Sequence, residues 1–254
     1  MNHFVYEGKK VFYKETGSGK PLIFLHGNTA SSRMFEQISD KYSKDFRVIL
    51  IDFLGHGKSD RLDVFPSDLW FYEAQQIIAF LKEKQYQDVN LIGSSGGAMV
   101  AINIALEAPK LVNKIIADSF EGEFSSSIFT QNLLKDRENA KNNAGARGFY
   151  EYMHGSDWEQ IVDNDTSAII RHQKEIGHFF HKQLESLETD ILLTGSTEDK
   201  FMYSISDHYY EKVYGDIVSK IKNGSIHLFS KGDHPAILSC FQEFYPLSID
   251  FLLS

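Results

Sequence analysis

The sequence predicts an α/β fold: a mostly parallel, doubly wound sheet with helices on both faces and an inserted helical cap. Three observations predict it. Short apolar runs alternate with segments of helical periodicity through most of the chain. One of these runs ends in a Gly-x-Ser-x-Gly turn that leads at once into a helical pattern, at residues 89–100. A length of 254 residues suits one α/β domain with an insertion.

The elements before the cap follow from the pattern of apolar residues. The first is a hairpin that turns at Gly8-Lys9. Pro109 ends the last helix of this part. Parallel strands of this kind are covered by helices on both faces, so a site is expected at their carboxyl ends. The expected strands are 4–6, 11–15, 22–25, 48–51, 89–92 and 111–117, and the expected helices are 32–42, 68–84 and 96–107.

The strand signal disappears between residues 118 and 189, where the sequence becomes polar and helical. We therefore expect a core domain formed by residues 1–119 and 188–254 and a helical cap formed by residues 120–187. A breaker-rich stretch at 139–148 interrupts the cap. In the second part of the core, the expected elements are strands at 190–195 and 226–229 and a last helix at 237–253.

Ser95 is the candidate nucleophile. Glycine stands two residues before it and two residues after it, at Gly93 and Gly97, and Ser94 lacks this spacing. A serine at such a strand–turn–helix corner has a strained backbone and presents its hydroxyl to open space. The flanking positions need glycine because a Cβ there would collide across the turn. The alternative interpretation is a glycine-rich turn that only connects the two elements or holds a phosphate.

A nucleophilic serine needs a base and a group that orients the base. His234 is the candidate base, because it lies between the last strand and the last helix and because the triad of such folds runs in the order Ser, acid, His. A capping or loop-packing histidine is the alternative. The acid is expected after the strand at 190–195, where Asp199 is favoured over Glu198, since a shorter side chain holds an imidazole more rigidly. Asp118, at the end of the preceding strand, is the third candidate.

Two backbone N–H groups are expected to form the oxyanion hole. One belongs to Gly96, directly after the turn, and the other to Asn28, in the loop after the strand at 22–25. Gly27 allows the backbone of that loop to approach closely. His26 is interpreted as a structural hydrogen-bonding residue under the loop and not as a catalytic one.

Four motifs, in this order along the chain, carry a resemblance to a known family: His26-Gly27-Asn28, Asp-Phe-Leu-Gly-His-Gly-Lys-Ser at 52–59, Gly-Ser-Ser-Gly-Gly at 93–97, and Gly232-Asp233-His234. With them the chain resembles the α/β-hydrolase superfamily, and within it a small bacterial group of carboxylesterases, lactonases, C–C bond hydrolases and haloalkane dehalogenases. The resemblance covers residues 4–117 and 190–253.

The acid loop both follows and departs from the family pattern. Asp199-Lys200-Phe201 is similar to the Asp-Arg-Phe that follows the same strand in relatives, which favours Asp199. The loop between Gly195 and Asp199 is one residue longer than usual in the family, which keeps Glu198 in consideration.

The residue at the turn limits the chemistry that the resemblance implies. Dehalogenases and epoxide hydrolases of this family carry Asp there, so Ser95 argues against both reactions. The expected function is hydrolysis of a small carboxylic ester through an acyl-enzyme, by the triad Ser95, His234 and Asp199 and without a cofactor. Lactone or C–C bond hydrolysis with the same triad is the first alternative. A non-catalytic small-ligand receptor on the same scaffold is the alternative from another class.

Caps in this family form the roof of the substrate site, so the large apolar residues of the cap are candidate substrate contacts. Each of them is individually also a candidate for the interior of the cap. The primary candidates are Phe149, Tyr152, Trp158 and Phe179, and Tyr150, Met153 and Phe180 are further ones.

Two polar clusters of the cap partly resemble metal sites. One helical segment contains several possible ligands but no His-Glu-x-x-His signature, so no metal is expected. Asp163-Asn164-Asp165 lacks the glycine and the distal glutamate of a calcium loop, and it is interpreted as a turn and N-cap before Thr166. The possible ligands of the first cluster are His172, Glu175, His178 and His181.

Composition restricts the partners. The net charge of −9 argues against nucleic acid and against an anionic membrane surface. The expected partner is the small-molecule ester that the resemblance implies. The first ten residues lack the apolar segment of a signal peptide, and no apolar run is long enough to span a bilayer. Cys240 is the single cysteine, so no intramolecular disulfide is possible. This fits the cytoplasmic location that we expect, and it fits a disulfide-free secreted enzyme as well. The sequence leaves the oligomeric state open.

Overall fold

The fold is built on one eight-stranded sheet. The computed structural model describes residues 2–254. The strand order is β1-β2-β4-β3-β5-β6-β7-β8, in which β2 pairs antiparallel with β1 and β4, and all other neighbours are parallel. The mostly parallel α/β sheet predicted from the sequence is confirmed. The strands are β1 (Asn2–Tyr6), β2 (Lys9–Thr16), β3 (Pro21–Leu25), β4 (Arg47–Ile51), β5 (Val89–Ser94), β6 (Val112–Asp118), β7 (Asp190–Ser196) and β8 (Gly224–Phe229).

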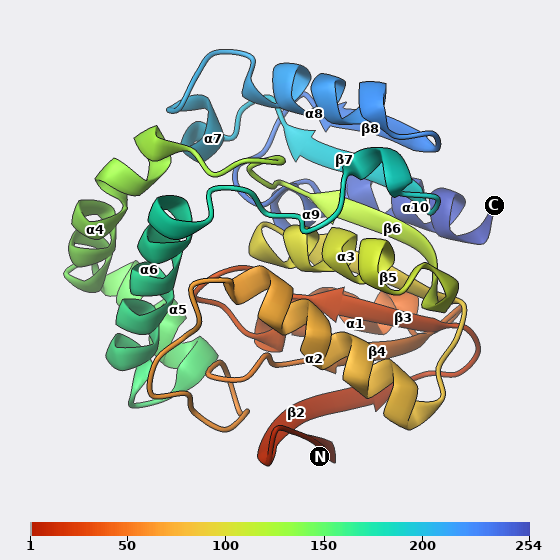
Figure 1. Ribbon diagram of the computed structural model, residues 1–254, viewed down its shortest axis with the longest axis horizontal. Helices are drawn as coiled ribbons and strands as arrows, with labels where there is room; N and C mark the ends of the chain where they lie inside the picture. The colour runs from red at the N-terminus through yellow and green to blue at the C-terminus, as the bar shows by residue number, and fades with distance from the viewer. Residues whose placement is uncertain (1) are drawn as a thin grey trace.

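Helices cover both faces of the sheet (Figure 1). Successive side chains of a strand point to opposite faces, and in β3 Ile23 and Leu25 join one apolar layer while Leu22 and Phe24 join the other. The first layer contains α2 (Leu69–Lys84), α3 (Gly96–Glu107) and α8 (Tyr209–Lys220). The second contains η1 (Ser32–Phe35), α1 (Glu36–Tyr42), α9 (Ala236–Ser239) and α10 (Phe241–Leu253).

Three further helices are inserted between β6 and β7. They lie together to one side of the sheet, in green in Figure 1. Tyr150, Trp158 and Val162 form a small apolar cluster within this group. The segment expected as a cap is therefore helical. The inserted helices are α4 (Ser127–Lys141), α5 (Ala144–His154) and α6 (Trp158–Glu175), and the short η3 (Leu184–Ser186) follows them before β7.

The structure differs from the expected elements in three places. The breaker-rich stretch is short, because α4 runs to Lys141 and Asn143 then caps α5 by accepting the N–H groups of Gly145 and Ala146. The last helical pattern is divided at Cys240 into α9 and α10. The short α7 (Lys200–Tyr203) and the 12-residue α8 had no counterpart among the expected elements. A short η2 (Pro109–Leu111) leads into β6.

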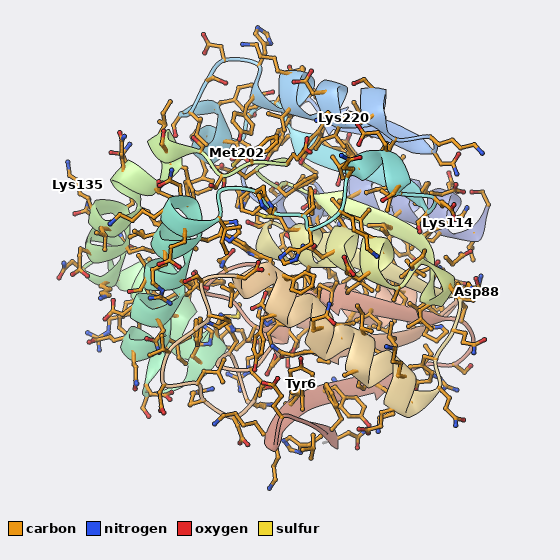
Figure 2. The ribbon with its side chains drawn as sticks, viewed as in Figure 1. Tyr6, Asp88, Lys114, Lys135, Met202 and Lys220 are labelled. Carbon is orange, nitrogen blue, oxygen red and sulfur yellow. The ribbon has the colours of Figure 1, made fainter. Side chains whose placement is uncertain are left out.

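Charged and apolar side chains are both exposed on the outer surface of the molecule. Asp88 and Lys135 are exposed, as Figure 2 shows, whereas Met202 is buried close to the carboxyl end of β7. Within residues 2–254, none of the helices has both the length and the apolar character needed to cross a lipid bilayer.

Candidate active site

Ser95 occupies the corner between β5 and α3. β5 ends at Ser94 and α3 begins at Gly96. The Ser95 backbone has φ 54° and ψ −121°, which is a strained conformation for a residue with a Cβ. Its N–H donates to the carbonyl of Asp118 at 2.7 Å, which helps to hold the strained corner. The corner therefore has the geometry of a nucleophile elbow.

Close backbone contacts explain the two flanking glycines. A Cβ on Gly93 would lie 2.2 Å from the carbonyl oxygen of Gly97, and a Cβ on Gly97 would lie 2.0 Å from that of Leu25. Backbone atoms at such distances could not move aside without distorting the sheet. Ser94 is fully buried and its Oγ has no hydrogen-bond partner in the described part of the chain, whereas Ser95 is partly exposed.

His234 and Asp199 form a hydrogen-bonded pair. Nδ1 of His234 lies 2.8 Å from Oδ2 of Asp199, and the Asp199 side chain is fully buried. The Tyr210 hydroxyl donates to the same oxygen at 2.6 Å. The other oxygen, Oδ1, accepts the N–H groups of Phe201 and Met202 at 3.1 Å each. Because an ionised carboxylate only accepts hydrogen bonds, Nδ1 carries the proton and Nε2 of His234 remains free to accept one.

The same partners keep Asp199 ionised. Burial alone would raise the pKa of Asp199, but the hydrogen bond and charge of His234 and the hydroxyl of Tyr210 hold it below its ordinary value. The carboxylate is therefore charged at neutral pH.

The two other candidate acids do not contact the His234 ring. Glu198 is exposed and forms no hydrogen bond with His234 among residues 2–254. Asp118 is fully buried, but its Oδ2 accepts the N–H of Ile237 at 3.0 Å and its Oδ1 accepts the hydroxyl of Thr194 at 2.8 Å. Burial raises the pKa of Asp118 to about 6. Asp118 thus supports the chain that follows His234.

Tyr210 is a site residue that the sequence analysis missed. It lies at the start of α8, and its ring also packs on Gly195, where a Cβ would lie 2.8 Å from the Tyr210 ring. Tyr210 and Tyr214 are one helical turn apart and both are buried. Such spacing predicts a buried helix face, but it contains no signal for a hydrogen bond to Asp199.

The loop after β3 lies against the elbow. A Cβ on Gly27 would be 3.0 Å from the Cβ of Ser95, so glycine allows the loop to approach the serine. The backbone N–H groups of Asn28 and Gly96 form no hydrogen bond with any other described residue. Both donors are therefore available to a ligand beside Ser95.

His26 supports this loop from below. The residue is buried, its Nε2 accepts the N–H of Phe53 at 3.2 Å, and its Nδ1 donates to the carbonyl of Gly27 at 2.9 Å. Burial, reinforced by the charge of His56, lowers the pKa of His26 to about 3, so the ring is neutral. These contacts agree with the structural role expected for it.

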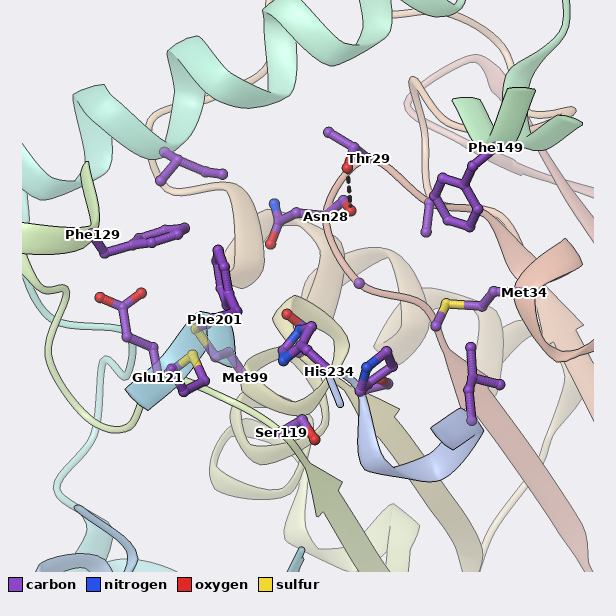
Figure 3. A pocket seen from close by; sticks show the side chains of 18 of the residues that line it. Asn28, Thr29, Met34, Met99, Ser119, Glu121, Phe129, Phe149, Phe201 and His234 are labelled. Atoms are coloured by element: carbon purple, nitrogen blue, oxygen red, sulfur yellow. Dashed lines mark hydrogen bonds between the residues drawn. The ribbon is translucent and has the colours of Figure 1, made fainter. Parts of the chain in front are cut away.

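The Ser95 hydroxyl and the His234 ring open on one cavity of about 530 Å³ between the core and the inserted helices (Figure 3). Among residues 2–254, the side chain of His234 is hydrogen-bonded to Asp199 and not to Ser95 Oγ. In unliganded sites, hydrogen bonds of this kind often form only when substrate binds. Most of the wall is apolar, and Figure 3 shows Phe129 and Phe201 on it. The apolar lining includes Met34, Trp70, Met99, Phe129, Phe149, Tyr150, Ile169, Phe201, Met202 and Leu238.

Two polar residues of the inserted segment also line this cavity, and the sequence analysis had named neither. Burial raises the pKa of Glu121 to about 8, and this side chain accepts the N–H of Ser126. Arg137, on α4, donates from Nη1 to the hydroxyl of Tyr150 at 3.0 Å. At neutral pH the cavity wall therefore contains a guanidinium and a largely neutral carboxyl group.

Phe149 is the one primary cap candidate that lines the cavity, and the other three predicted contacts do not line it. Tyr152 lies on the outer side of α5, where its hydroxyl donates to Glu36. The Trp158 ring stacks on Tyr150 within the group of inserted helices. Phe179 is buried against the rings of Trp70 and His172. Among the further candidates Tyr150 lines the cavity, whereas Met153 and Phe180 are buried elsewhere.

The interpretation of Asp163-Asn164-Asp165 as a turn and N-cap is wrong, because these residues lie in the middle of α6. Asp165 is fully buried there.

The histidines of this region have separate partners. Nδ1 of His172 lies 3.1 Å from the carbonyl of Ser67, and Nε2 of His181 lies 2.5 Å from Asp68. Across residues 2–254, no group of three or more His, Cys, Asp or Glu side chains is arranged to hold a metal ion.

Comparisons with known proteins agree with this geometry. The family model described as the alpha/beta hydrolase fold matches residues 20–150, which is more than half of the chain. Serine hydrolase BPHL of Homo sapiens is 24% identical and the alignment covers 96% of this chain and 84% of that protein. The 2-hydroxy-6-oxo-6-phenylhexa-2,4-dienoate hydrolase of Comamonas testosteroni is also 24% identical, over 95% of this chain and 91% of that protein.

A solved structure shares the fold across the whole length. The meta-cleavage product hydrolase of Pseudomonas fluorescens superposes with a TM-score of 0.80 at 19% identity, covering 99% of this chain and 97% of that one. The sheet order, the elbow and the family match lead to one conclusion: this chain belongs to the α/β-hydrolase fold family.

Proposed function

We propose that this protein is a serine hydrolase that cleaves a small carboxylic ester through an acyl-enzyme intermediate. Ser95 is the nucleophile, His234 the base and Asp199 the acid that orients the base. One observation carries the proposal: the Asp199–His234 pair, joined at 2.8 Å, opens on the same cavity as a serine held at a strained elbow.

In the acylation step, Nε2 of His234 takes the proton of the Ser95 hydroxyl while Oγ attacks the ester carbonyl carbon. The carbonyl oxygen becomes an oxyanion, and the N–H groups of Asn28 and Gly96 stabilise it. The bond to the alcohol oxygen then breaks, and the alcohol leaves with the proton from His234. Asp199 stays ionised and stabilises the imidazolium through Nδ1–H.

The deacylation step repeats these moves with water. His234 takes a proton from water as the water oxygen attacks the acyl carbon, and the same two N–H groups hold the second oxyanion. The bond from the carbonyl carbon to Ser95 Oγ breaks, Ser95 regains its proton from His234, and the carboxylic acid is released.

A second candidate is hydrolysis of a lactone or of a C–C bond with the same triad. The observation that favours the C–C reaction is the full-length similarity to the Comamonas testosteroni hydrolase, whose named substrate is a phenyl-substituted oxo-dienoate. A non-catalytic small-ligand receptor is the candidate from another class, since a fold by itself does not establish activity.

Labelling by a fluorophosphonate separates a hydrolase from a receptor. We expect the wild type and Ser94→Ala to be labelled and Ser95→Ala to be unlabelled. With a p-nitrophenyl ester as substrate, Ser95→Ala should lose on the order of 10⁴-fold or more in kcat, and Ser94→Ala should retain substantial activity. Hydrolysis by Ser95→Ala near the wild-type rate would show that another residue is the nucleophile.

A series of substrates then separates the reactions. The cavity is largely apolar, so each added methylene of the acyl chain that it buries should gain about 0.8 kcal/mol until the chain meets the wall. We expect kcat/KM for p-nitrophenyl esters to be highest at short acyl chains. A steady rise into long chains with activation at a lipid interface would indicate a lipase. Labelling without ester hydrolysis at any length would favour a lactonase or a C–C hydrolase.

A further inference from the structure

Asp165 connects the cap helix α6 to the loop beside the elbow. Its side chain is fully buried. Its Oδ2 accepts hydrogen bonds from Nδ2 of Asn28 at 3.1 Å, from the N–H of Thr29 at 3.0 Å and from Nε2 of His56 at 3.3 Å. One carboxylate of the cap thus holds two consecutive residues of the loop that approaches Ser95.

The bonds made by Asp165 are charge-assisted. Burial alone would raise the pKa of Asp165, but the hydrogen bond and charge of His56, the charge of Arg137 and the Thr29 N–H bring it below its ordinary value. Hydrogen bonds to an ionised acceptor are stronger than those between neutral groups. The cap therefore holds the loop more firmly than apolar packing alone would.

Thr29 adopts a conformation that needs such support. Its φ is 54°, in the left-handed region, which is unfavourable for a residue with a branched side chain. Its N–H is held by Asp165, and its carbonyl accepts Nε2–H of His154, on α5, at 3.0 Å. A strained backbone conformation persists only where several contacts from neighbouring residues hold it in place. Here both neighbours belong to the cap.

The side chain of Asn28 is held between the core and the cap. Its Oδ1 accepts Nε1–H of Trp70, on α2, at 3.2 Å, while its Nδ2 donates to Asp165. The side chain lies directly over Gly96, because a Cβ built on Gly96 would be 2.3 Å from Asn28 Oδ1. Both ends of the amide are therefore occupied, and the Asn28 backbone N–H stays unused within the described part of the chain.

The geometry points to Asp165 as a positioning residue for the oxyanion hole. Through the Asn28 side chain and the Thr29 N–H, it holds the Asn28 backbone N–H where the developing oxyanion binds. This inference rests on the proposed acyl-transfer function. It gives the cap a role in the chemistry of every substrate, including those too small to reach the cavity roof.

The primary test is Asp165→Asn, which keeps the size of the side chain and removes its charge. We expect kcat for a p-nitrophenyl ester to fall roughly 10- to 100-fold with KM little changed, less than the loss from deleting an oxyanion donor outright. Binding of a trifluoromethyl ketone, which forms a tetrahedral adduct with the serine, should weaken by a similar factor. If Asp165 had only a structural role, Asp165→Asn would instead lower the thermal midpoint of unfolding or raise KM. The affinity for the trifluoromethyl ketone would then equal that of the wild type.

Asp157→Asn is the matched control. Asp157 also joins the cap to the core, by two bonds to Arg61 at 2.7 and 3.0 Å, but it has no bond to Asn28 or Thr29. We expect its kcat and inhibitor binding to stay near the wild-type values. An equal loss in Asp157→Asn would overturn the inference, because general docking of the cap would then explain both variants.

Asn28→Ala keeps the inference testable if Asp165→Asn does not fold. It should show the same combined loss of kcat and inhibitor affinity, and the double variant should be little worse than either single one. Wild-type kcat in Asn28→Ala, or in folded Asp165→Asn, would overturn the positioning role while leaving the hydrolase proposal intact. A wild-type protein that neither hydrolyses esters nor reacts with fluorophosphonate would overturn both.

Discussion

Asp199 is the residue whose surroundings say most about the proposed chemistry. Four donors meet its two oxygens, and two of them, the His234 ring and the Tyr210 hydroxyl, share Oδ2. A carboxylate so fully bonded has no freedom to rotate, so it sets both the tautomer and the orientation of the imidazole. Glu198, its neighbour, points to solvent.

The first prediction at this scale separates these two carboxylates. Asp199→Asn should lower kcat about 10⁴-fold, because an amide that donates to Nδ1 stabilises the wrong tautomer. Glu198→Gln is the control and should retain kcat near the wild-type value, since its side chain is exposed. The measurement is kcat with a p-nitrophenyl ester for both variants. A severe loss of kcat in Glu198→Gln, together with wild-type kcat in Asp199→Asn, would make Glu198 the acid. A mild loss of kcat in both variants would make Asp118 the acid.

At the scale of elements, the junction of β5 and α3 depends on contact with β3. The backbone of Gly97 packs on the carbonyl of Leu25, the last residue of β3. The start of α3 therefore packs directly on the end of β3. Because the loop that carries Asn28 follows β3, the elbow cannot shift without moving that loop. The rigidity of this junction keeps Ser95 and the two N–H donors in fixed relation.

A pair of glycine substitutions tests this junction. Gly97→Ala should lower the free energy of unfolding by roughly 3 kcal/mol or more, because its Cβ would lie 2.0 Å from a backbone oxygen. Gly148→Ala, inside α5 with nothing within 4 Å of the added Cβ, should raise it by roughly 0.5–1 kcal/mol. Urea unfolding of both variants measures the difference. A Gly97→Ala variant as stable as the wild type would show that the elbow can relax.

At the scale of the whole molecule, the core and the inserted helices together bury ionisable groups around one cavity. Glu121 is the clearest case, because it follows β6, lines the cavity and is only 8% exposed. Its carboxyl group keeps its proton up to about pH 8 in the folded protein, whereas the ordinary pKa is 4.5. Unfolding in this pH window therefore releases a proton, and the contribution of Glu121 to the free energy of unfolding falls as the pH rises from about 4.5 to about 8.

Glu121→Gln should remove this pH dependence. Relative to the wild type, the variant should gain stability as the pH is raised from about 5 to about 8.5, by on the order of a few kcal/mol. The measurement is the free energy of unfolding in urea at several pH values, with exposed Glu188→Gln as the control. A constant difference between Glu121→Gln and wild type across this range would mean that Glu121 is already ionised in the folded protein.

The sequence by itself determined what short-range sterics encode. The glycines around Ser95 and the glycine before Asn28 mark close backbone approaches that only one turn geometry satisfies, so the elbow and the loop beside it could be predicted. The alternation of apolar strands and helices likewise predicted a mostly parallel sheet, because such strands must be covered on both faces. The bounds of α3 were predicted to the residue, since glycine and proline delimit it.

Only the tertiary structure decided which side chains meet. Whether an aromatic residue of the cap lines the cavity depends on the rotation of its helix, so Phe149 reaches the cavity while Tyr152, three residues later, points outward. Asp165 meets Asn28 across 137 residues, and its segment lies in the middle of α6 and not in a turn. Tyr210 reaches Asp199 because its ring packs on Gly195, near the end of β7. Contacts of this kind arise from the packing of whole elements, which no local pattern of residues specifies.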